Sequence, residues 1–367
     1  MQEELSSRIL ARIALGTGVP MDDAEFDALA LAAFAHQFAG NPPYRAYCAR
    51  RGATPETVGH WSEVPAVPTD AFKAAALVCG DPARATVFRT SGTTRGAGRR
   101  GAHYLPDLAL YDASLRAGFS THLLPGVERL RIVSLVPHPH DVPDSSLSHM
   151  VGEVARAFGT VASGWYLTPD GGIAHEPLAA ALLEVESSGE PVCVAGTAFA
   201  FVHWLDALAE RGETFRLSPG SRVMDTGGFK GRSREVTREE LYGAIAERLG
   251  VPAAWCVNEY GMTEMSSQFY DGVAGSADPP GERLHSGPPW VRTRAADPET
   301  LRLLPHGEVG VLRHWDLANL HSVMAIQTAD LGVTAPGGFR VLGRAAGATA
   351  RGCSLAMDDL LAALGPH

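Results

Sequence analysis

Strand-like apolar segments alternate with helical segments through the middle of the chain, and this alternation most constrains the fold. Short apolar runs predict strands at Thr86–Arg89, Leu130–Val136, Val192–Ala195, Val223–Met224 and Ala253–Val257. Apolar residues at three- and four-residue spacing predict helices at Leu108–Thr121, Ser146–Phe158, Leu178–Ser187, Phe199–Arg211 and Arg238–Leu249. Strands and helices that alternate at this spacing predict an α/β fold with a mainly parallel sheet covered by helices.

The two ends of the chain have other patterns. Helical periodicity at 5–15 and 22–38 predicts that residues 1–60 form a helical N-terminal part. The stretch 272–305 is rich in Gly, Pro and Arg, which predicts loops. Further short apolar segments predict strands at Val309–Arg313, Val323–Thr328 and Phe339–Leu342, and a last short helix near Met357–Leu364.

Length and charge limit the class of protein. A chain of 367 residues predicts one large domain or two unequal ones. No apolar run approaches the roughly 20 residues of a membrane helix, and Met1 is followed by acidic Glu3 and Glu4 rather than a basic leader, so we expect a cytoplasmic protein without a membrane partner. A net charge of −10 argues against a nucleic-acid partner, which would require a basic surface.

A run of hydroxyl and glycine residues, 89–96 (Arg-Thr-Ser-Gly-Thr-Thr-Arg-Gly), lies between a predicted strand and a predicted helix. Its hydroxyls and glycines supply side-chain and backbone donors that can surround phosphate oxygens. Arg99 and Arg100 follow, where they could neutralise the same charge. An ordinary Ser/Thr/Gly turn has the same composition, so this run alone leaves both interpretations open.

A second polar motif, 258–264 (Asn-Glu-Tyr-Gly-Met-Thr-Glu), follows the predicted strand that ends at Val257. Strand ends are where open α/β sheets bind ligands. Tyr260 offers a flat face for a base, Thr263 a hydroxyl group, and Glu264 a hard oxygen ligand that suits Mg²⁺. The motif therefore predicts a nucleotide and metal contact at this strand end.

A third motif comes near the end of the chain. Asp330 lies in 327–332 (Gln-Thr-Ala-Asp-Leu-Gly), and Arg344 ends the segment 339–344 after a short turn. The Asp330 carboxylate could accept hydrogen bonds from both hydroxyls of a ribose, and Arg344 could place a cation beside them.

These three motifs, in this order, resemble the adenylate-forming superfamily of acyl-CoA synthetases and adenylation domains. The resemblance implies the large N-terminal domain of those enzymes, with layered mixed sheets and helices, and implies ATP and Mg²⁺ as substrate and cofactor. Carried over by position, the implied ATP-binding residues are Thr90, Ser91, Gly92, Thr93, Thr94, Gly228, Asn258, Glu259, Tyr260, Gly261, Thr263, Asp330 and Arg344. The resemblance also assigns Mg²⁺ to Glu264.

Four shorter segments are similar to the acyl-protein synthetase branch that serves bacterial bioluminescence, namely 68–73, 145–147, 227–230 and 351–355. Members of that branch activate a fatty acid as its adenylate and then move the acyl group to a cysteine near the C-terminus. Cys353 matches that position. The resemblance therefore implies a thioester on Cys353 and a partner that receives the acyl group: an acyl carrier protein with its phosphopantetheine thiol, CoA or a reductase.

The chain also departs from the wider superfamily. Its phosphate loop continues as 95–100 (Arg-Gly-Ala-Gly-Arg-Arg) without the usual lysine, and only 23 residues follow Arg344 where the superfamily has a C-terminal domain with a catalytic lysine. We therefore expect a large domain at 1–343 and a short C-terminal strap at 344–367. Lys230 is the candidate catalytic lysine, because Lys73 and Lys230 are the only lysines beside 29 arginines.

Two alternatives to an adenylating ligase stay open. One is an acyltransferase that moves an acyl group from acyl-CoA through Cys353 to a carrier protein without ATP, and the other is a nucleotide-binding scaffold without turnover. Cys353 has a polar setting beside Arg351, which favours a reactive thiolate. The other cysteines lie in apolar segments and are expected in the core: Cys48, Cys79, Cys193 and Cys256.

A group of histidines has a pattern that could suggest a metal site. His138, His140, Asp141 and His149 lie close together in the sequence, but prolines interleave the first two histidines, and no helix-borne pair matches a metal-binding motif. A loop beside the acyl pocket is the preferred interpretation.

Overall fold

The structure is a computed structural model, and it describes residues 2–91, 100–227, 236–345, 357 and 361–362. These residues form two compact units that each combine distant parts of the chain. Unit 1 contains residues up to Ala117, the segment Met262–Gln268 and the residues from Ser286 onward. Unit 2 contains Gly118–Gly261 and Phe269–His285. The mixture of helices and sheets confirms the predicted α/β class.

The sheet of unit 2 has six strands in the order β5-β4-β6-β7-β8-β9. The first five pair in parallel, and β9 alone pairs antiparallel, with β8. The strands are β4 (Arg131–Leu135), β5 (Gly164–Trp165), β6 (Val192–Thr197), β7 (Arg222–Thr226), β8 (Cys256–Tyr260) and β9 (Phe269–Tyr270). A mainly parallel sheet was the central prediction from the alternating pattern, and the strand pairing confirms it.

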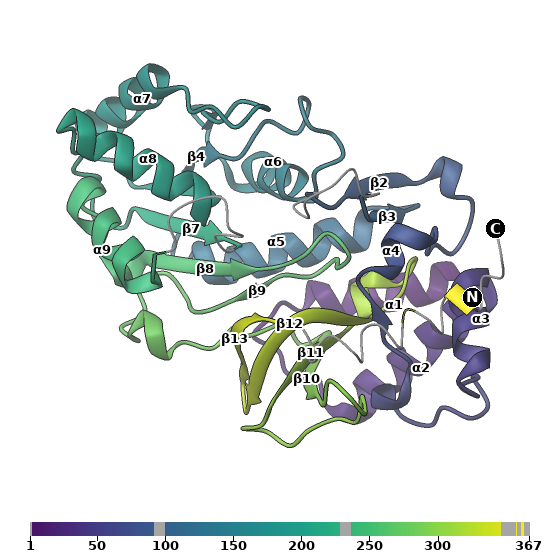
Figure 1. The fold of residues 1–367 in the computed structure, drawn as a ribbon. Coiled ribbons are helices and arrows are strands. Elements are labelled where there is room, and N and C mark those ends of the chain that lie inside the picture. The colour runs from purple at the N-terminus through teal and green to yellow at the C-terminus, as the bar shows by residue number, and fades with distance from the viewer. Residues whose placement is uncertain (1, 92–99, 228–235, 346–356, 358–360, 363–367) are drawn as a thin grey trace. The chain divides into compact units, whose positions relative to one another are not determined.

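Helices cover this sheet (Figure 1). The apolar core between sheet and helices includes Trp204, Tyr242 and Val194, all nearly without solvent exposure. The helices of this unit are α6 (Ser146–Phe158), α7 (His175–Ser188), α8 (Ala198–Arg211) and α9 (Arg238–Leu249), and the end of α5 (Ala109–Leu123). Helix α9 begins with a complete capping box, in which Thr237 and Glu240 each bind the backbone N–H of the other, so its first residue is well defined.

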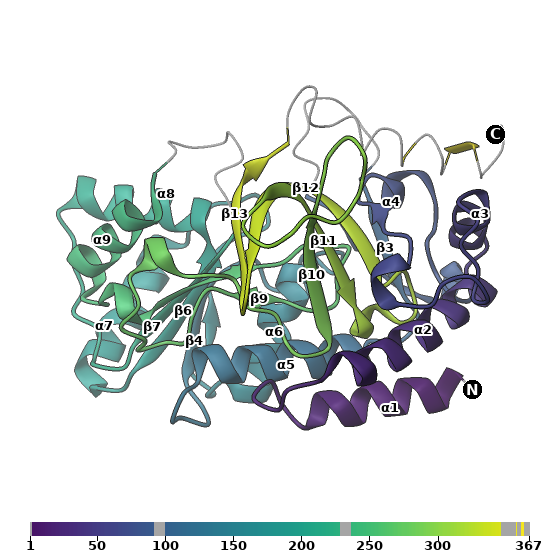
Figure 2. The same ribbon diagram turned by 90° about the horizontal axis from the view of Figure 1, so that it is seen from below.

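The sheet of unit 1 is mostly antiparallel, and its central strand is long. Strand β12 (Ala325–Ala335) pairs on one side with β11 (Val309–Asp316), which pairs with β10 (Val291–Ala296). On its other side, β12 pairs in parallel with β1 (Val67–Pro68) and then antiparallel with β13 (Gly338–Arg344). Figure 2 shows β10 to β13 side by side.

The remaining elements of unit 1 are short strands and helices. They are α1 (Gln2–Ala14), α2 (Asp23–Gly40), α3 (Pro42–Arg50), α4 (Ala71–Ala74), β2 (Thr86–Arg89) and β3 (Ala102–Leu105). The side chain of Gln37 on α2 ties this helix to the turn before β12, because its amide donates to the carbonyls of Asn319 and Leu320. Trp315 packs edge-on against Trp61 at 4.9 Å and donates to the Val64 carbonyl.

Some sequence predictions of local structure were wrong, and strand β3 was not predicted. The predicted strand at Ala253–Val257 begins only at Cys256, because Ala253–Trp255 forms a 3₁₀ turn. The predicted loop region 272–305 contains β10. Its alternating pattern is short, lies between prolines and includes Arg292 and Arg294, so the composition of the region indicated loops instead. Among the described residues, no helix is both long and apolar enough to cross a membrane.

Candidate active site

The hydroxyl-rich loop joins two antiparallel strands of unit 1. Strands β2 and β3 pair from Thr86 opposite Leu105 to Arg89 opposite Ala102, so the loop begins and ends at neighbouring positions. This corrects the prediction that it lies between a strand and a helix.

Thr90 closes the base of this loop. Its N–H donates to the Gly101 carbonyl at 3.0 Å, and its hydroxyl accepts from the Gly101 N–H at 2.9 Å. A side chain on Gly101 would come within 3.0 Å of the Thr90 methyl group, so a glycine suits this close approach. Arg100 donates to the Thr90 and Arg89 carbonyls, and Ser91 is exposed. Gly92, Thr93 and Thr94 lie outside the described residues.

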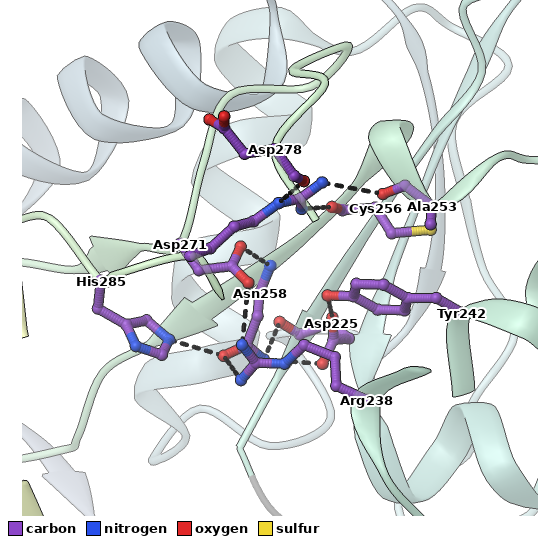
Figure 3. A network of polar contacts seen from close by, with 10 residues as sticks. Asp225, Arg238, Tyr242, Ala253, Cys256, Asn258, Asp271, Asp278 and His285 are labelled. Carbon is purple, nitrogen blue, oxygen red and sulfur yellow. Dashed lines mark hydrogen bonds and ion pairs between the residues drawn. The ribbon is translucent and has the colours of Figure 1, made fainter. Parts of the chain in front are cut away.

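Asn258 lies in the middle of β8, within a buried polar network (Figure 3). Its amide nitrogen donates to the carboxylate of Asp225 at 2.7 Å and to the Asp225 carbonyl at 3.2 Å. Its side-chain oxygen accepts from Arg238 at 2.9 Å and from His285 at 2.8 Å. A side-chain amide offers two donors and two acceptor sites, so all four are occupied within unit 2.

Ionisable groups surround Asn258 in the same network. Arg238 forms an ion pair of 3.0 Å with the fully buried Asp271, which also accepts from the Asn258 N–H at 2.7 Å. Burial raises the pKa of Asp271 to about 6, although the Arg238 charge opposes this. Burial also raises the pKa of Asp225, which accepts a hydrogen bond from the Tyr242 hydroxyl. The network therefore holds β7, β8, α9 and the segment after β9 together.

Glu259 is buried beside Thr226 at the ends of β8 and β7. The two residues are opposite each other in the parallel register, and the Thr226 hydroxyl donates to the Glu259 carboxylate. Burial is the largest cause that raises the pKa of Glu259 to about 7; the Thr226 hydrogen bond lowers this pKa, and the nearby Asp225 charge raises it. Gly227 follows Thr226 with φ of 74°, a left-handed conformation that favours glycine.

Tyr260 ends β8 and is half-buried, and Gly261 beyond it is exposed. The Tyr260 ring is near two buried rings, with centroids 5.9 Å from Phe269 and 5.7 Å from His285. Unit 2 ends at Gly261 in this part of the chain, and the motif continues into unit 1 at Met262. One short motif thus supplies residues to both units.

Thr263 and Glu264 are anchored in unit 1 through their main chain. The Thr263 carbonyl accepts from His103 Nδ1 on β3 at 2.7 Å, and the Glu264 carbonyl accepts from the Asn319 amide at 2.8 Å. Burial lowers the pKa of His103 to about 4, so this ring is neutral near pH 7. The Glu264 side chain is mostly buried.

Asp316 at the end of β11 fixes the residues that follow Glu264. Its fully buried carboxylate accepts from the N–H groups of Ser266 and Ser267 at 3.1 and 2.8 Å, and from the Ser267 hydroxyl at 2.7 Å. Burial raises the pKa of Asp316 to about 6 despite these bonds. Sequence reasoning missed Asp316, although its place at a strand end is the same signal that identified the motif at 258–264.

Asp330 and Arg344 are brought together, as the sequence predicted. They are opposite each other in the register of β12 and β13, and Arg344 Nε lies 3.5 Å from Asp330 Oδ1. The Asp330 N–H donates to the Thr328 hydroxyl at 3.0 Å. The Arg344 side chain is two-thirds exposed, so it can reach a ligand beside the carboxylate.

Gly228, Lys230 and Cys353 lie outside the described residues. The four other cysteines are buried, which confirms their predicted place in the core. Burial raises the pKa of Cys48, Cys79 and Cys193 to about 12, and it also raises the pKa of Cys256 well above the ordinary value of a thiol. These thiols are protonated at neutral pH and are poor nucleophiles.

The described part of the chain does not support a metal site formed by several protein side chains. No group of three or more His, Cys, Asp or Glu side chains there could hold a metal ion. Glu264 offers a single carboxylate. This suits Mg²⁺, which is commonly held by one or two carboxylates together with substrate phosphates.

Comparisons with known proteins show the family and the fold of the chain. The family model described as "Acyl-protein synthetase, LuxE" matches residues 18–362. The chain belongs to this family. It is therefore an enzyme of the acyl-protein synthetase type, and the resemblance seen in the sequence is confirmed.

Two curated relatives are long-chain-fatty-acid–luciferin-component ligases. The ligase of Vibrio harveyi is 23% identical over 90% of this chain and 86% of its own length. The ligase of Aliivibrio fischeri is 22% identical over 84% of this chain and 78% of its own length.

Solved structures of adenylate-forming enzymes share the fold. The chain is similar to an open conformation of 2-hydroxyisobutyryl-CoA ligase in complex with 2-HIB-AMP and CoA, with a TM-score of 0.62 and 17% identity. The match covers 90% of this chain and 76% of that one. The post-adenylation state of the same ligase gives a TM-score of 0.63, with 89% of this chain and 69% of that one covered. The predicted adenylate-forming fold is thus confirmed.

Proposed function

We propose that the protein joins a carboxylic acid to ATP as an acyl adenylate and then transfers the acyl group through Cys353 to a partner thiol or protein. Family membership supports acyl activation, and the Asp330–Arg344 pair on β12 and β13 is the observation that carries nucleotide binding. A carboxylate with a flanking guanidinium is suited to a ribose and the phosphate attached to it.

In the first step, the substrate carboxylate attacks the α-phosphorus of ATP. The bond from this phosphorus to the oxygen that bridges the β-phosphate breaks, and pyrophosphate leaves. The loop Thr90–Thr94 would bind the phosphates, Tyr260 the base, and Asp330 the ribose. Positioning and charge stabilisation supply most of the catalysis in such a displacement.

Mg²⁺ would neutralise phosphate charge during this step, with Glu264 as its protein ligand. The role of the chain is to hold Glu264 in place. The Asn319 amide bonds the Glu264 carbonyl, and the Asp316 carboxylate bonds the two serines that follow. A rigid main chain on both sides limits the positions that the Glu264 carboxylate can take.

In the second step, the Cys353 thiolate attacks the acyl carbonyl carbon. The thioester C–S bond forms, the bond between the acyl carbon and the AMP oxygen breaks, and AMP leaves. The buried, protonated state of the other four cysteines supports Cys353 as the acyl carrier. Cys353 follows Arg344 by nine positions, so the chain from one to the other spans at most about 30 Å.

We further propose that residues 344–367 act as a strap that carries Cys353 between the large domain at 1–343 and a partner. The partner would be a carrier-protein phosphopantetheine thiol, CoA or a reductase. The names of the relatives suggest a long-chain fatty acid as the substrate. Lys230 would take the place of the catalytic lysine that the wider superfamily carries in its C-terminal domain.

An ATP-independent acyltransferase is the second candidate, and one observation favours it. The phosphate loop has no lysine, so the chain could retain the thioester step alone and accept its acyl group from acyl-CoA. A scaffold without turnover would bind nucleotide and do neither reaction.

Two measurements on the full chain separate these functions. Pyrophosphate release with ATP, Mg²⁺ and a panel of long-chain and short hydroxy acids identifies an adenylating ligase. Intact-protein mass after incubation with acyl-CoA identifies the acyltransferase by the mass of one acyl group. Absence of pyrophosphate release with every acid would overturn the adenylation proposal.

A further inference from the structure

The Tyr260 ring is held by its neighbours in unit 2 rather than by its own strand alone. Tyr260 is half-buried, whereas the neighbouring Phe269 and His285, with ring centroids within 6 Å, are almost fully buried. Phe269 is also opposite Tyr260 in the antiparallel pairing of β8 and β9. Two buried rings therefore restrict the orientation of one partly exposed ring.

The His285 ring is fixed by a hydrogen bond on its far side. Its Nε2 lies 2.8 Å from the Asn258 side-chain oxygen, which can only accept, so Nε2 carries the proton. Arg238 donates to the same oxygen at 2.9 Å. In Figure 3 the imidazole and the guanidinium group meet at the Asn258 amide.

The amide that holds His285 is itself fixed. Asp225 accepts two hydrogen bonds from its nitrogen, and the Asp271 carboxylate binds both the Asn258 N–H and the Arg238 guanidinium group. The Asp271 N–H returns a bond of 3.0 Å to the Asn258 carbonyl. Rotation of the His285 ring would therefore break its hydrogen bond to the Asn258 side chain, because the other hydrogen bonds of Asn258 hold that side chain in place.

The His285 ring keeps one protonation state under ordinary conditions. Burial, with a smaller contribution from the Arg238 charge, lowers the pKa of His285 to about 3. The ring is neutral at any pH at which the enzyme would be assayed. Its contact with Tyr260 is therefore one of packing and orientation, without a change of charge.

We propose that His285 is a positioning residue for nucleotide binding, because it holds the Tyr260 ring in the orientation that stacks on the base. This inference rests on the proposed role of Tyr260. According to this proposal, His285 contributes to the affinity for ATP although it is buried and does not contact the ligand directly. The alternative is that His285 only stabilises the fold of unit 2.

Two substitutions separate the effect of the His285 ring from the effect of its hydrogen bond to Asn258. His285→Gln keeps an N–H donor for Asn258 and removes the ring, and we expect it to raise the Kd for ATP about tenfold, as part of a stacking contact is lost. His285→Phe keeps a ring against Tyr260 and removes the donor. We expect a Kd within about threefold of wild type but a lower melting temperature, because Asn258 loses one of its partners.

Tyr242→Phe is the matched control in the same network. It removes the hydrogen bond to Asp225 and leaves the rings around Tyr260 unchanged. The melting temperature should fall, while the Kd for ATP measured by calorimetry stays within about twofold, because the bond from His285 to Asn258 remains. If His285 were only structural, the Kd would follow the melting temperature across all three variants.

A double-mutant cycle with Tyr260→Ala completes the test. His285→Gln should raise the Kd in the wild-type background and leave it unchanged in the Tyr260→Ala background. An unchanged Kd in Tyr260→Ala alone would overturn the stacking role of Tyr260 in the proposed function. A raised Kd in Tyr260→Ala, with no effect of His285→Gln in wild type, would overturn only the positioning role of His285.

Discussion

Asp330 and Arg344 face each other across β12 and β13, with Arg344 Nε 3.5 Å from Asp330 Oδ1. The Arg344 side chain is 67% exposed and the Asp330 side chain 18% exposed. Exposed ion pairs contribute about 0–1 kcal/mol to stability, so the pair has little effect on folding. A substitution here can therefore be interpreted through ligand binding.

We predict that Asp330→Ala weakens ATP binding by about 1.5–3 kcal/mol, the usual loss for hydrogen bonds to a charged acceptor. Calorimetry with ATP and Mg²⁺ measures this change. Asp23→Ala is the matched control, because Asp23 is an exposed carboxylate of the same unit that pairs with Arg292 at 3.2 Å. Equal affinities in wild type and Asp330→Ala would show that Asp330 does not hold the ribose.

Lys230→Ala should slow adenylate formation at least tenfold with little change in the Kd for ATP. This pattern is expected when an interaction forms mainly in the transition state. Lys73→Ala is the control, since Lys73 is the only other lysine and forms a partly exposed ion pair with Asp70 at 2.7 Å. Single-turnover pyrophosphate release gives the rate, and parallel losses of rate and affinity would instead make Lys230 a ground-state phosphate contact.

Cys353→Ser should abolish acyl labelling that hydroxylamine removes, because the serine hydroxyl cannot form the thioester. Pyrophosphate release in the first turnover should survive, since adenylation does not need the thiol. Intact-protein mass spectrometry after incubation with ATP and fatty acid gives the result. Cys193→Ala serves as a control for a buried thiol, and thioester labelling that mapped to Cys193 would contradict the relay through Cys353.

Glu259→Gln should change how stability depends on pH. The folded pKa of Glu259 is about 7, against an ordinary value of 4.5. Below pH 4.5 both states hold the proton, whereas between pH 4.5 and 7 only the folded state keeps it, so the contribution of Glu259 to stability falls as the pH rises. At 1.36 kcal/mol per unit, the variant should gain about 3 kcal/mol relative to wild type over this window.

Urea unfolding of both proteins at pH 4.5, 6 and 8 measures the gain. The difference between the two proteins removes the opposing contribution of the buried histidines, which is common to both. Glu239→Gln, at an exposed position on α9, should show no such trend. A constant difference between Glu259→Gln and wild type across the three pH values would mean that Glu259 ionises normally in the folded protein.

Local patterns predicted much of the fold because they depend on neighbouring residues. The bounds of β2, α6 and α9 agree with the predictions, since caps and apolar periodicity lie within each segment. Strand β10 was missed because its alternation is short and includes charged residues that find partners far away in the sequence. Arg292, for example, pairs with Asp23.

The sequence predicted which motifs form the candidate site, but it predicted less well how their side chains are arranged in space. The spacing of 258–264 indicated a ligand-binding strand end, but nothing local indicated that the Asn258 amide turns inward. Its partners Arg238, Asp271 and His285 lie 13 to 27 residues away in the sequence, and only folding brings them together. The same holds for His103, which reaches Thr263 across 160 residues.

The sequence by itself determined the order of the motifs, the family and the chemistry of each side chain. Asp330 and Arg344 could be paired in advance, because a short turn between strands forces their segments together. The tertiary structure decided which polar groups are buried, and burial then set the pKa of Glu259, Asp316 and His285. Desolvation depends on every element packed around a group, so no local pattern in the sequence can supply it.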